Sequence, residues 1–460
     1  MSTSIKTEEA PRSGVATLES TPREGQTVSH DGKTFITVRE GLAHILVPEN
    51  ARTETDPKRK EDDGTAAQSV FYNPIQQFNR DLSVLAIRAF AEDLTNLRKA
   101  RMEAKAKKPR KKKPNRSTKR KADESIANGE KEDHQNTKVK LDSAEIKAEE
   151  DIAAGKDEPE EDAQNDDVPV EEGHEDVKPE GSSSATPRQP PPPPKPKFKI
   201  LDALSATGLR ALRYAHEIPQ VTQVTANDLS KQATESIQAN VKHNKLENKV
   251  TAVTGNAMSH MYSFVSHPAQ AYRDDKYDVI DLDPYGTAAT FLDGAVQALN
   301  DGGMLCVTCT DAGVWASVGY PEKCFSLYGG TPIKGLHSHE GGLRLILHSI
   351  ASAAAKHGMA IEPLLSLSID YYARVFVRVS KSPAEVKFLA GKTMLVYSCD
   401  MGCGAWQTQY LARHTKNTAK NGQVTYKHGL SQGPAVGPFC EHCGSKTHVS
   451  SSESPKQYKH

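Results

Sequence analysis

Long apolar runs are missing from this chain of 460 residues, and apolar side chains make up only 36% of it. No stretch of eighteen consecutive apolar residues occurs, which excludes a membrane-spanning helix. Cysteine is scarce, with seven residues, and this excludes a disulfide scaffold. The opening MSTSIKTEEAPRSG has no apolar core and carries acids early, so it predicts neither a secretory signal nor a mitochondrial presequence.

The charges are present in equal number but are segregated along the chain. Lys and Arg total 59, as do Asp and Glu. Fourteen basic residues and one acidic residue lie in Arg98–Lys121, whereas Asp142–Glu180 holds seventeen acidic and three basic residues, and a proline-rich stretch follows. Such a composition cannot bury enough apolar surface to offset chain entropy. We therefore expect residues 101–197 to form a disordered insertion, and residues 1–32 and 447–460 to be disordered ends.

The basic run Lys107–Lys121 is typical of a nuclear import signal and predicts an import receptor as partner and a nuclear location. Contact with RNA phosphates is a second role for it, and solvated charge in a loop is the simplest alternative. Residence in the mitochondrion or cytoplasm is left open. No membrane partner is expected.

Strands and helices alternate regularly from Phe198 onward. The pattern predicts a doubly wound, mostly parallel, seven-stranded sheet with an antiparallel edge over residues 198–385. Residues 33–100, with one amphipathic helix, are expected to belong to the same domain. A cysteine-containing module follows over 386–446. The expected strands are 198–204, 221–228, 250–257, 277–286, 304–311, 361–370 and 373–380, and the main expected helices are 207–218, 230–246, 288–303 and 341–358.

Polar residues stand where three of these strands end, at the edge where open α/β sheets bind ligands. The turn from Asp202 to Gly208 is built of small residues that let a ligand approach the backbone. It contains neither GxGxxG nor a Walker lysine, which disfavours dinucleotide and ATP sites. Asp228 can accept hydrogen bonds from ribose hydroxyls or cap the following helix. Asn256 and Ala257 can border an adenine edge.

The fourth strand runs into the strongest motif, which contains Asp283, Pro284 and Tyr285. Asp283 and the Pro284 carbonyl can accept the two hydrogens of an exocyclic amine, which directs the nitrogen lone pair at an electrophile. Tyr285 can stack on the base, and Asp283 can take the proton released by transfer. The alternative is a tight Asp-Pro turn that ends a strand. The position beside the other strand ends favours catalysis.

Two short-spaced cysteine pairs, separated by thirty-six residues, predict a structural zinc site of four thiolates. Glycines beside the pairs fit the tight turns that such ligands need. Reduced, unpaired thiols are the alternative, and either of the two nearby histidines can replace a cysteine. The four predicted ligands are Cys399, Cys403, Cys440 and Cys443, and the two histidines are His442 and His448.

In this order the strand-end motifs resemble class I S-adenosylmethionine-dependent methyltransferases. The Asp-Pro-Tyr signature is similar to that of the amino-methylating branch, although one proline stands here where that branch usually has two. A narrower set resembles the tRNA (guanine-26) N2-dimethyltransferase family in its eukaryotic, fungal-like form. It comprises Phe71-Tyr-Asn-Pro74, Asn79-Arg-Asp81, Arg39-Glu-Gly41, LDALSATGLRALR and DPYG. The resemblance covers about residues 34–100 and 198–445.

The resemblance implies a Rossmann-like class I methyltransferase domain, S-adenosylmethionine as cofactor, one or two methyl transfers to N2 of guanosine 26, and a C-terminal α+β zinc module that binds tRNA. It assigns roles at matching positions: the cofactor, with its carboxylate, to Arg80 and Arg210, the ribose to Asp228, the adenine to Asn256 and Ala257, and catalysis to Asp283. Without the resemblance, the simplest interpretation of Arg80 is a charged residue on a helix surface, and that of Arg210 is a residue that forms a salt bridge on a helix face.

Two other functions stay open at this point. One is a methyltransferase acting on DNA adenine or on a protein side chain, which the Asp-Pro-Tyr motif alone permits. The other is a catalytically impaired RNA-binding protein with the same fold. After Gly444 the chain lacks the Gly-Pro-Leu-Trp-type continuation that the resemblance implies. We therefore expect an incomplete C-terminal domain, which is what keeps the second alternative open.

Overall fold

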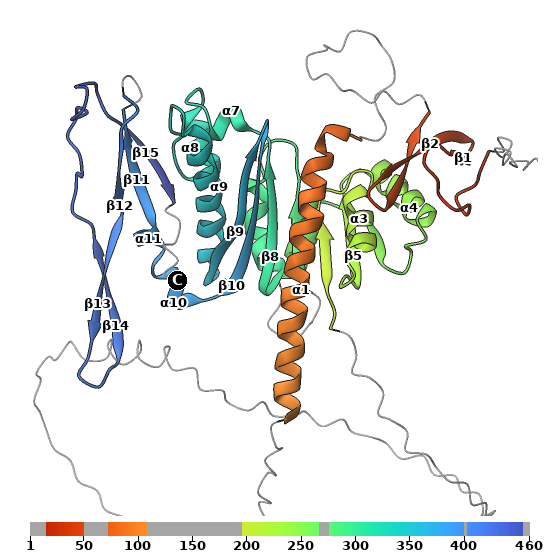
Figure 1. Cartoon of the computed structure of the whole chain (residues 1–460), viewed down its shortest axis with the longest axis horizontal. Helices are drawn as coiled ribbons and strands as arrows, with labels where there is room; N and C mark the ends of the chain where they lie inside the picture. Colours follow the sequence, from red (N-terminus) through yellow and green to blue (C-terminus); the bar gives the residue numbers. More distant parts are fainter. Residues whose placement is uncertain (1–14, 50–71, 108–195, 266–275, 400–402, 454–460) are drawn as a thin grey trace, which may run out of the picture. The chain divides into compact units, whose positions relative to one another are not determined.

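The computed structural model of the chain describes residues 15–49, 72–107, 196–265, 276–399 and 403–453 (Figure 1). The predicted import signal, apart from Lys107, and most of the predicted insertion lie outside these residues. The described N-terminal part forms a three-stranded antiparallel sheet of β1 (Thr27–His30), β2 (Lys33–Glu40) and β3 (Ala43–Pro48). It continues into a one-turn helix, η1 (Pro74–Gln76), and the long helix α1 (Gln77–Lys107).

A seven-stranded sheet forms the centre, in the order β6-β5-β4-β7-β8-β10-β9. The first five strands are parallel, and β10 is antiparallel to both of its neighbours. The predicted mostly parallel sheet is confirmed, but the antiparallel strand lies one position inside the edge. The strands are β4 (Lys199–Asp202), β5 (Gln223–Asp228), β6 (Val250–Thr254), β7 (Tyr277–Leu282), β8 (Leu299–Cys309), β9 (Met359–Ile369) and β10 (Tyr372–Lys381).

Two hydrophobic cores lie on the two faces of this sheet, because neighbouring residues of a strand point to opposite sides. On β4, Ile200 joins the core beneath α1, α3 and α4, and Leu201 joins the core beneath α6 and α9. Every residue of β7 is buried, because both faces of this strand lie against a hydrophobic core. The helices are α3 (Leu209–Glu217), α4 (Lys231–His243), α5 (Ala257–Tyr262), η3 (Ala289–Phe291), α6 (Leu292–Ala298), α7 (Ala312–Trp315), α8 (Pro321–Tyr328) and α9 (Ser338–Ala355).

A smaller module follows the central sheet. It begins with α10 (Pro383–Val386) and α11 (Leu389–Lys392). Its three-stranded sheet has the order β12-β11-β15, and its two-stranded hairpin is β13-β14. Met394 and Val396 of β11 pack with Ile333, and the Ser450 hydroxyl donates to the Pro332 carbonyl at 3.0 Å. The strands are β11 (Thr393–Ser398), β12 (Trp406–Tyr410), β13 (Ala412–Thr418), β14 (Val424–Leu430) and β15 (His448–Glu453).

Three predicted segment boundaries are wrong. Residues 15–32 were expected to be disordered, yet they contain β1, and Leu18 and Val28 pack on Leu46 of β3. The predicted insertion was expected to begin at 101, but α1 extends to Lys107 because its Ala, Arg, Lys, Glu and Met are strong helix formers. The predicted disordered tail supplies β15, which pairs with β11 along its whole length.

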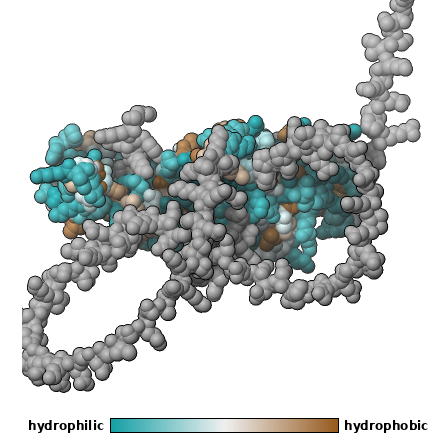
Figure 2. Space-filling model, turned by 90° about the horizontal axis from the view of Figure 1, so that it is seen from below, coloured by the Kyte–Doolittle hydropathy of each residue, from teal (hydrophilic) through white to brown (hydrophobic). Residues whose placement is uncertain are grey.

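Isolated apolar side chains lie among hydrophilic ones on the face drawn in Figure 2. Within the described ranges, none of the helices combines the length and the apolar character needed to cross a bilayer.

Candidate functional site

The carboxyl ends of β4, β5 and β7 meet at one edge of the sheet, because these strands are parallel neighbours. Asp202 at the end of β4 pairs in register with Ala226 of β5 and with Asp281 of β7. The turn after β4, the residues ending β5 and the Asp283-Pro284 motif after β7 therefore adjoin one another. This is the edge at which a doubly wound sheet binds ligands.

The turn between β4 and α3 is held by backbone conformation and by Asp228. Ala206 has φ 49° and Gly208 has φ 80°, the left-handed region in which glycine is favoured. A Cβ at Gly208 would also lie 3.2 Å from Ile237. Asp228 accepts the N–H groups of Ala206 and Ser230, each at 2.9 Å. Asp228 therefore braces this turn. The N-cap of α4 is Ser230, whose hydroxyl accepts the Ala233 N–H, so Asp228 is not the cap, and its ribose role stays a prediction.

Asp202 is a buried acid beside this turn. One of its oxygens accepts the Ser205 hydroxyl at 2.6 Å, and the other has no hydrogen-bond partner among the described residues. Burial, with the Asp281 carboxylate close by, raises its pKa to about 7. Asp202 therefore has one carboxylate oxygen that is able to accept a hydrogen bond at the predicted cofactor edge.

The Asp283-Pro284-Tyr285 motif places a buried proline between a partly exposed carboxylate and an exposed aromatic ring. The Asp283 side chain is 24% exposed, Pro284 is buried, and Tyr285 is 79% exposed. Gly286 and Thr310 hydrogen-bond to each other twice at 2.8 Å and so fix the loop to the end of β8. The arrangement gives a partly exposed carboxylate and an exposed aromatic ring on one braced loop, as an amine clamp requires.

Arg210 of α3 is a direct partner of Asp283. Its Nε donates to Asp283 at 2.9 Å, its Nη2 donates to the same oxygen, and its Nη1 donates to the Ser83 hydroxyl at 3.1 Å. Arg374 of β10, fully buried, donates to Asp281 at 2.7 Å and to Ser83 at 2.9 Å. The sequence analysis named Arg210 as a cofactor contact, which stays a prediction, and it did not identify Ser83 or Arg374. The apolar strand ARVFVRVS contains two arginines, and an arginine in so apolar a strand is a signal that an acid lies near it, as Asp281 lies beside Arg374.

Arg80 lies in a buried ion-pair group. Its guanidinium donates to Glu40 through Nε at 2.7 Å and Nη2 at 2.5 Å, and to the Asn73 carbonyl at 2.9 Å. Arg213 donates to the same Glu40 at 2.9 Å. Burial opposes the charge of Glu40, but the two arginines lower its pKa. Arg80 is therefore not the surface charge of the alternative reading, and its contact with the cofactor stays a prediction.

Asn256 and Ala257 follow β6 at the predicted adenine edge. The Asn256 side chain accepts the N–H groups of Met258 and Ser259 and caps α5. Ala257 is buried in the core under α6. Asn227 at the end of β5 donates to the Gly255 carbonyl at 3.1 Å and so joins the two strand ends. Asn256 is thus engaged with its own helix, and the adenine role of both residues stays a prediction.

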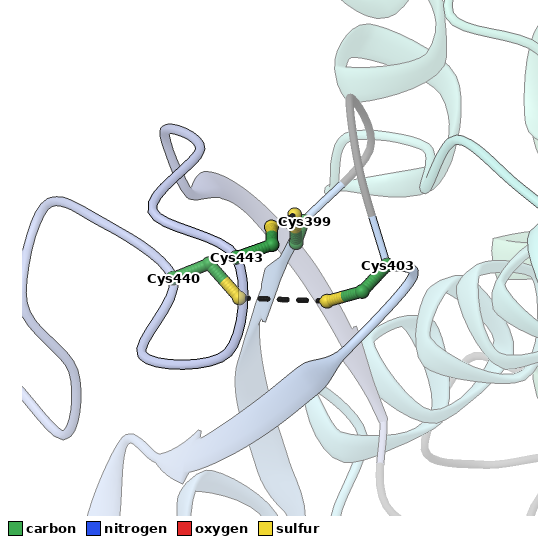
Figure 3. A group of neighbouring side chains, drawn as sticks. All are labelled: Cys399, Cys403, Cys440 and Cys443. Carbon is green, nitrogen blue, oxygen red and sulfur yellow. Dashed lines mark hydrogen bonds between the residues drawn. The ribbon is translucent and has the colours of Figure 1, made fainter.

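The four predicted zinc ligands come together at one end of the C-terminal module (Figure 3). Their sulfur atoms all lie within 4.8 Å of one another. The Cys399 and Cys443 sulfurs are 3.4 Å apart, and those of Cys403 and Cys440 are 3.6 Å apart. A tetrahedral Zn–S₄ centre places its sulfurs about 3.8 Å apart, so the donor set fits zinc. The three other cysteines are buried in the core of the central sheet.

The strand order, with acids at the ends of β4, β5 and β7, defines the class as a Rossmann-like methyltransferase fold. A solved structure with this fold is Trm1 from Pyrococcus horikoshii in complex with S-adenosyl-L-methionine, with a TM-score of 0.50 and 22% identity over 82% of this chain and 69% of that one. A profile of the N2,N2-dimethylguanosine tRNA methyltransferase family matches residues 41–451. The chain therefore belongs to that family.

Curated relatives extend this similarity over most of the chain. The mitochondrial tRNA (guanine(26)-N(2))-dimethyltransferase of Saccharomyces cerevisiae is 38% identical over 90% of this chain and 59% of its own length. The Schizosaccharomyces pombe enzyme is 39% identical over 83% and 58%, and the human enzyme 36% over 93% and 52%. The chain thus spans between half and three fifths of the relatives it matches.

Proposed function

We propose that this protein transfers methyl groups from S-adenosylmethionine to the exocyclic N2 of guanosine 26 in tRNA. The observation that carries the proposal is the Asp283-Pro284-Tyr285 clamp, braced at the end of β7 in a chain of the dimethylguanosine tRNA methyltransferase family. The named activity of the relatives supports the substrate and the target atom. DNA adenine and protein side chains, the earlier alternatives, have no comparable support.

The residues at the strand ends fit the cofactor. The unpartnered, buried oxygen of Asp202 can accept a hydrogen bond from an ammonium group, and Asp228 keeps lone pairs for ribose hydroxyls. Bound S-adenosylmethionine supplies a methyl group on a positively charged sulfur, the electrophile of the reaction. We assign cofactor binding to these residues together with Arg80, Gly208, Arg210, Asn256 and Ala257.

In the proposed mechanism Asp283 has two roles, which are to orient the guanine amine and to accept a proton. Its carboxylate and the Pro284 carbonyl accept the two hydrogens of the guanine amine, and this orients the nitrogen lone pair toward the methyl group. The exposed Tyr285 ring stacks on the base. After transfer the nitrogen carries a positive charge, and Asp283 accepts the proton it releases.

The decisive experiment uses the purified chain, tritium-labelled S-adenosylmethionine and unmodified tRNA, followed by nucleoside analysis. We expect labelled N2-methylguanosine or its dimethyl form, and none with tRNA carrying adenosine at position 26. Asp283→Ala should abolish labelling while cofactor binding by calorimetry persists. Full labelling by Asp283→Ala would disprove the mechanism, and cofactor binding without labelling by the unaltered chain would favour the impaired RNA-binding alternative.

The C-terminal module is proposed to hold zinc and to bind tRNA. The fit of the four sulfurs supports zinc. From Cys403 to Cys440 the sequence contains no acidic residue, and its arginine and lysines are exposed, as are several of its aromatic side chains. Such a surface suits phosphate backbones. The exposed residues are Arg413, Lys416, Lys420 and Lys427, with Trp406 and Tyr426.

The location of the protein is also a proposal. The basic run Lys107–Lys121 supports nuclear import through a receptor. The mitochondrial name of the budding-yeast relative supports the mitochondrion. Imaging of the tagged chain, with the run's lysines and arginines replaced by alanine, separates the two, because loss of nuclear signal is expected only if the run is the import signal.

A further inference from the structure

A group of buried polar side chains lies behind Asp283, and we call it the arginine cluster. It joins four segments that are far apart in the sequence: α1, α3, β7 and β10. Arg374 and Asp281 are each 0% exposed, and the Arg210 side chain is 8% exposed. The cluster consists of Ser83, Arg210, Asp281 and Arg374.

Asp281 has two cations within reach. Its Oδ1 accepts Arg374 at 2.7 Å, and its Oδ2 lies 3.6 Å from Arg210 Nη1. Burial opposes its charge, yet Arg374 and Arg210 lower its pKa, so the carboxylate stays ionised. A buried, ionised carboxylate left without a partner is very costly. Without Arg374, the uncharged Tyr214 hydroxyl would be the remaining side-chain donor to Asp281 among the described residues, and the carboxylate would therefore draw the charged Arg210 toward itself.

The guanidinium of Arg210 lies near two acids, Asp283 and Asp281, and presents different nitrogen atoms to each. Its Nε and Nη2 both face Asp283, and only Nη1 faces Asp281 and Ser83. Because Arg374 already satisfies Asp281, Arg210 is free to engage Asp283. The Ser83 hydroxyl accepts from both arginines and donates to the Asn79 carbonyl at 2.7 Å, which fixes the spacing of the guanidinium groups.

We propose that Arg374 and Ser83 are positioning residues, which hold Arg210 on Asp283 and thereby orient the carboxylate that receives the guanine amine. This inference rests on the proposed function. In the proposed mechanism, neither Arg374 nor Ser83 contacts the base or the cofactor. Arg374 acts by occupying Asp281, and Ser83 acts by setting the two guanidinium groups from α1.

The test compares single-turnover methylation rates of the full chain at saturating tRNA and cofactor. Arg374→Met should slow methyl transfer on the order of 10- to 100-fold, the loss expected when a reacting group is displaced by about 1 Å. The double variant Arg374→Met/Asp281→Asn removes the competing charge, so Arg210 should return to Asp283 and most of the rate should recover. A residue that only supports the core would show no such recovery.

Ser83→Ala provides a second, smaller change that leaves the apolar packing in place. It should slow transfer at saturating substrates while the KM values for tRNA and cofactor change little. Thr95→Val is the matched control, because Thr95 is also buried on α1 and its hydroxyl likewise donates to a carbonyl one turn earlier, that of Ala91 at 2.7 Å. It meets no arginine of the cluster.

The outcomes separate this inference from the proposed function. If Asp283→Ala is inactive but Ser83→Ala turns over like Thr95→Val, the positioning roles are wrong and the proposed function stands. A double variant as slow as Arg374→Met has the same meaning. If Asp283→Ala keeps its full rate, the proposed function itself fails. Should Arg374→Met not fold, as judged by circular dichroism, Ser83→Ala decides the question.

Discussion

Asp202 illustrates how one buried carboxyl group makes stability depend on pH. Its pKa is about 7 in the folded protein, against a reference value of 3.8. The folded state therefore holds the proton more tightly than the unfolded state does. The stabilisation from this proton is complete below about pH 4 and is lost as pH rises toward 7. Each unit of pKa difference corresponds to about 1.4 kcal/mol, so the effect is large for a single side chain.

Asp202→Asn should remove that pH dependence. The amide oxygen can still accept the Ser205 hydroxyl, but no proton is bound or released. Between pH 5 and pH 7.5 the free energy of unfolding of the unaltered protein should fall by about 2 kcal/mol more than that of the variant. Denaturant titrations at both pH values measure this, with the exposed Asp93→Asn as control. Equal pH slopes in all three proteins would contradict the assignment.

Helix α4 ties the N-terminal sheet to the edge of the proposed site. Asn240 accepts the Leu46 N–H and donates to the Thr207 carbonyl, both at 2.8 Å. One helical turn later, Asn244 accepts the His44 N–H at 2.9 Å and donates to the His44 carbonyl. Two asparagines on one face of the helix thus substitute for a neighbouring strand along β3. The N-terminal sheet is part of the support of the turn that carries Gly208.

Asn240→Ala should weaken both the fold and the proposed cofactor site. It leaves the Leu46 N–H and the Thr207 carbonyl buried without a partner, which costs about 1–3 kcal/mol for each group. We expect a lower unfolding free energy in urea and a weaker calorimetric affinity for S-adenosylmethionine. Gln238→Ala, an exposed change on the same helix, should leave both values unchanged. If Asn240→Ala binds the cofactor with unaltered affinity, the contacts between α4 and β3 do not support the proposed cofactor site.

At the scale of the whole molecule, the C-terminal module has few buried apolar side chains of its own. Most residues of β12, β13 and β14 are at least partly exposed, and the buried group around Met394 and Val396 is completed by Ile333 from outside the module. A small fold with so little core generally needs a crosslink or a metal. The four cysteines join the loop after β11 to the loop before β15, where zinc would provide that crosslink.

Removing zinc should therefore loosen the module and spare the central sheet. We expect one zinc per chain by mass spectrometry of metals, and loss of it in Cys440→Ser. Amide hydrogen exchange should then increase in β11 and β15 while β4 and β7 keep their protection. Cys324→Ala, which alters a buried thiol in the core of the central sheet, should retain the metal. Zinc retention by Cys440→Ser would show that another ligand set holds it.

The sequence alone determined the features that depend on local pattern. Alternating apolar strands and amphipathic helices predicted the doubly wound sheet, because burial on both faces imposes that pattern. Parallel strands end at the same edge, so Asp202, Asp228 and Asp283 could be expected to meet there. Cysteine spacing predicted the group of four sulfurs, because short pairs place two thiols on one turn.

The side chains that those residues meet could be learned only from the folded structure. Arg80 faces Glu40, Arg374 faces Asp281, and Asn256 is engaged as a helix cap. The strand β15 also forms from a polar stretch, since its partner β11 supplies the ladder of hydrogen bonds. Such contacts join residues up to 291 positions apart, as between Ser83 and Arg374. No local periodicity records them, because they depend on the order in which the strands are laid side by side.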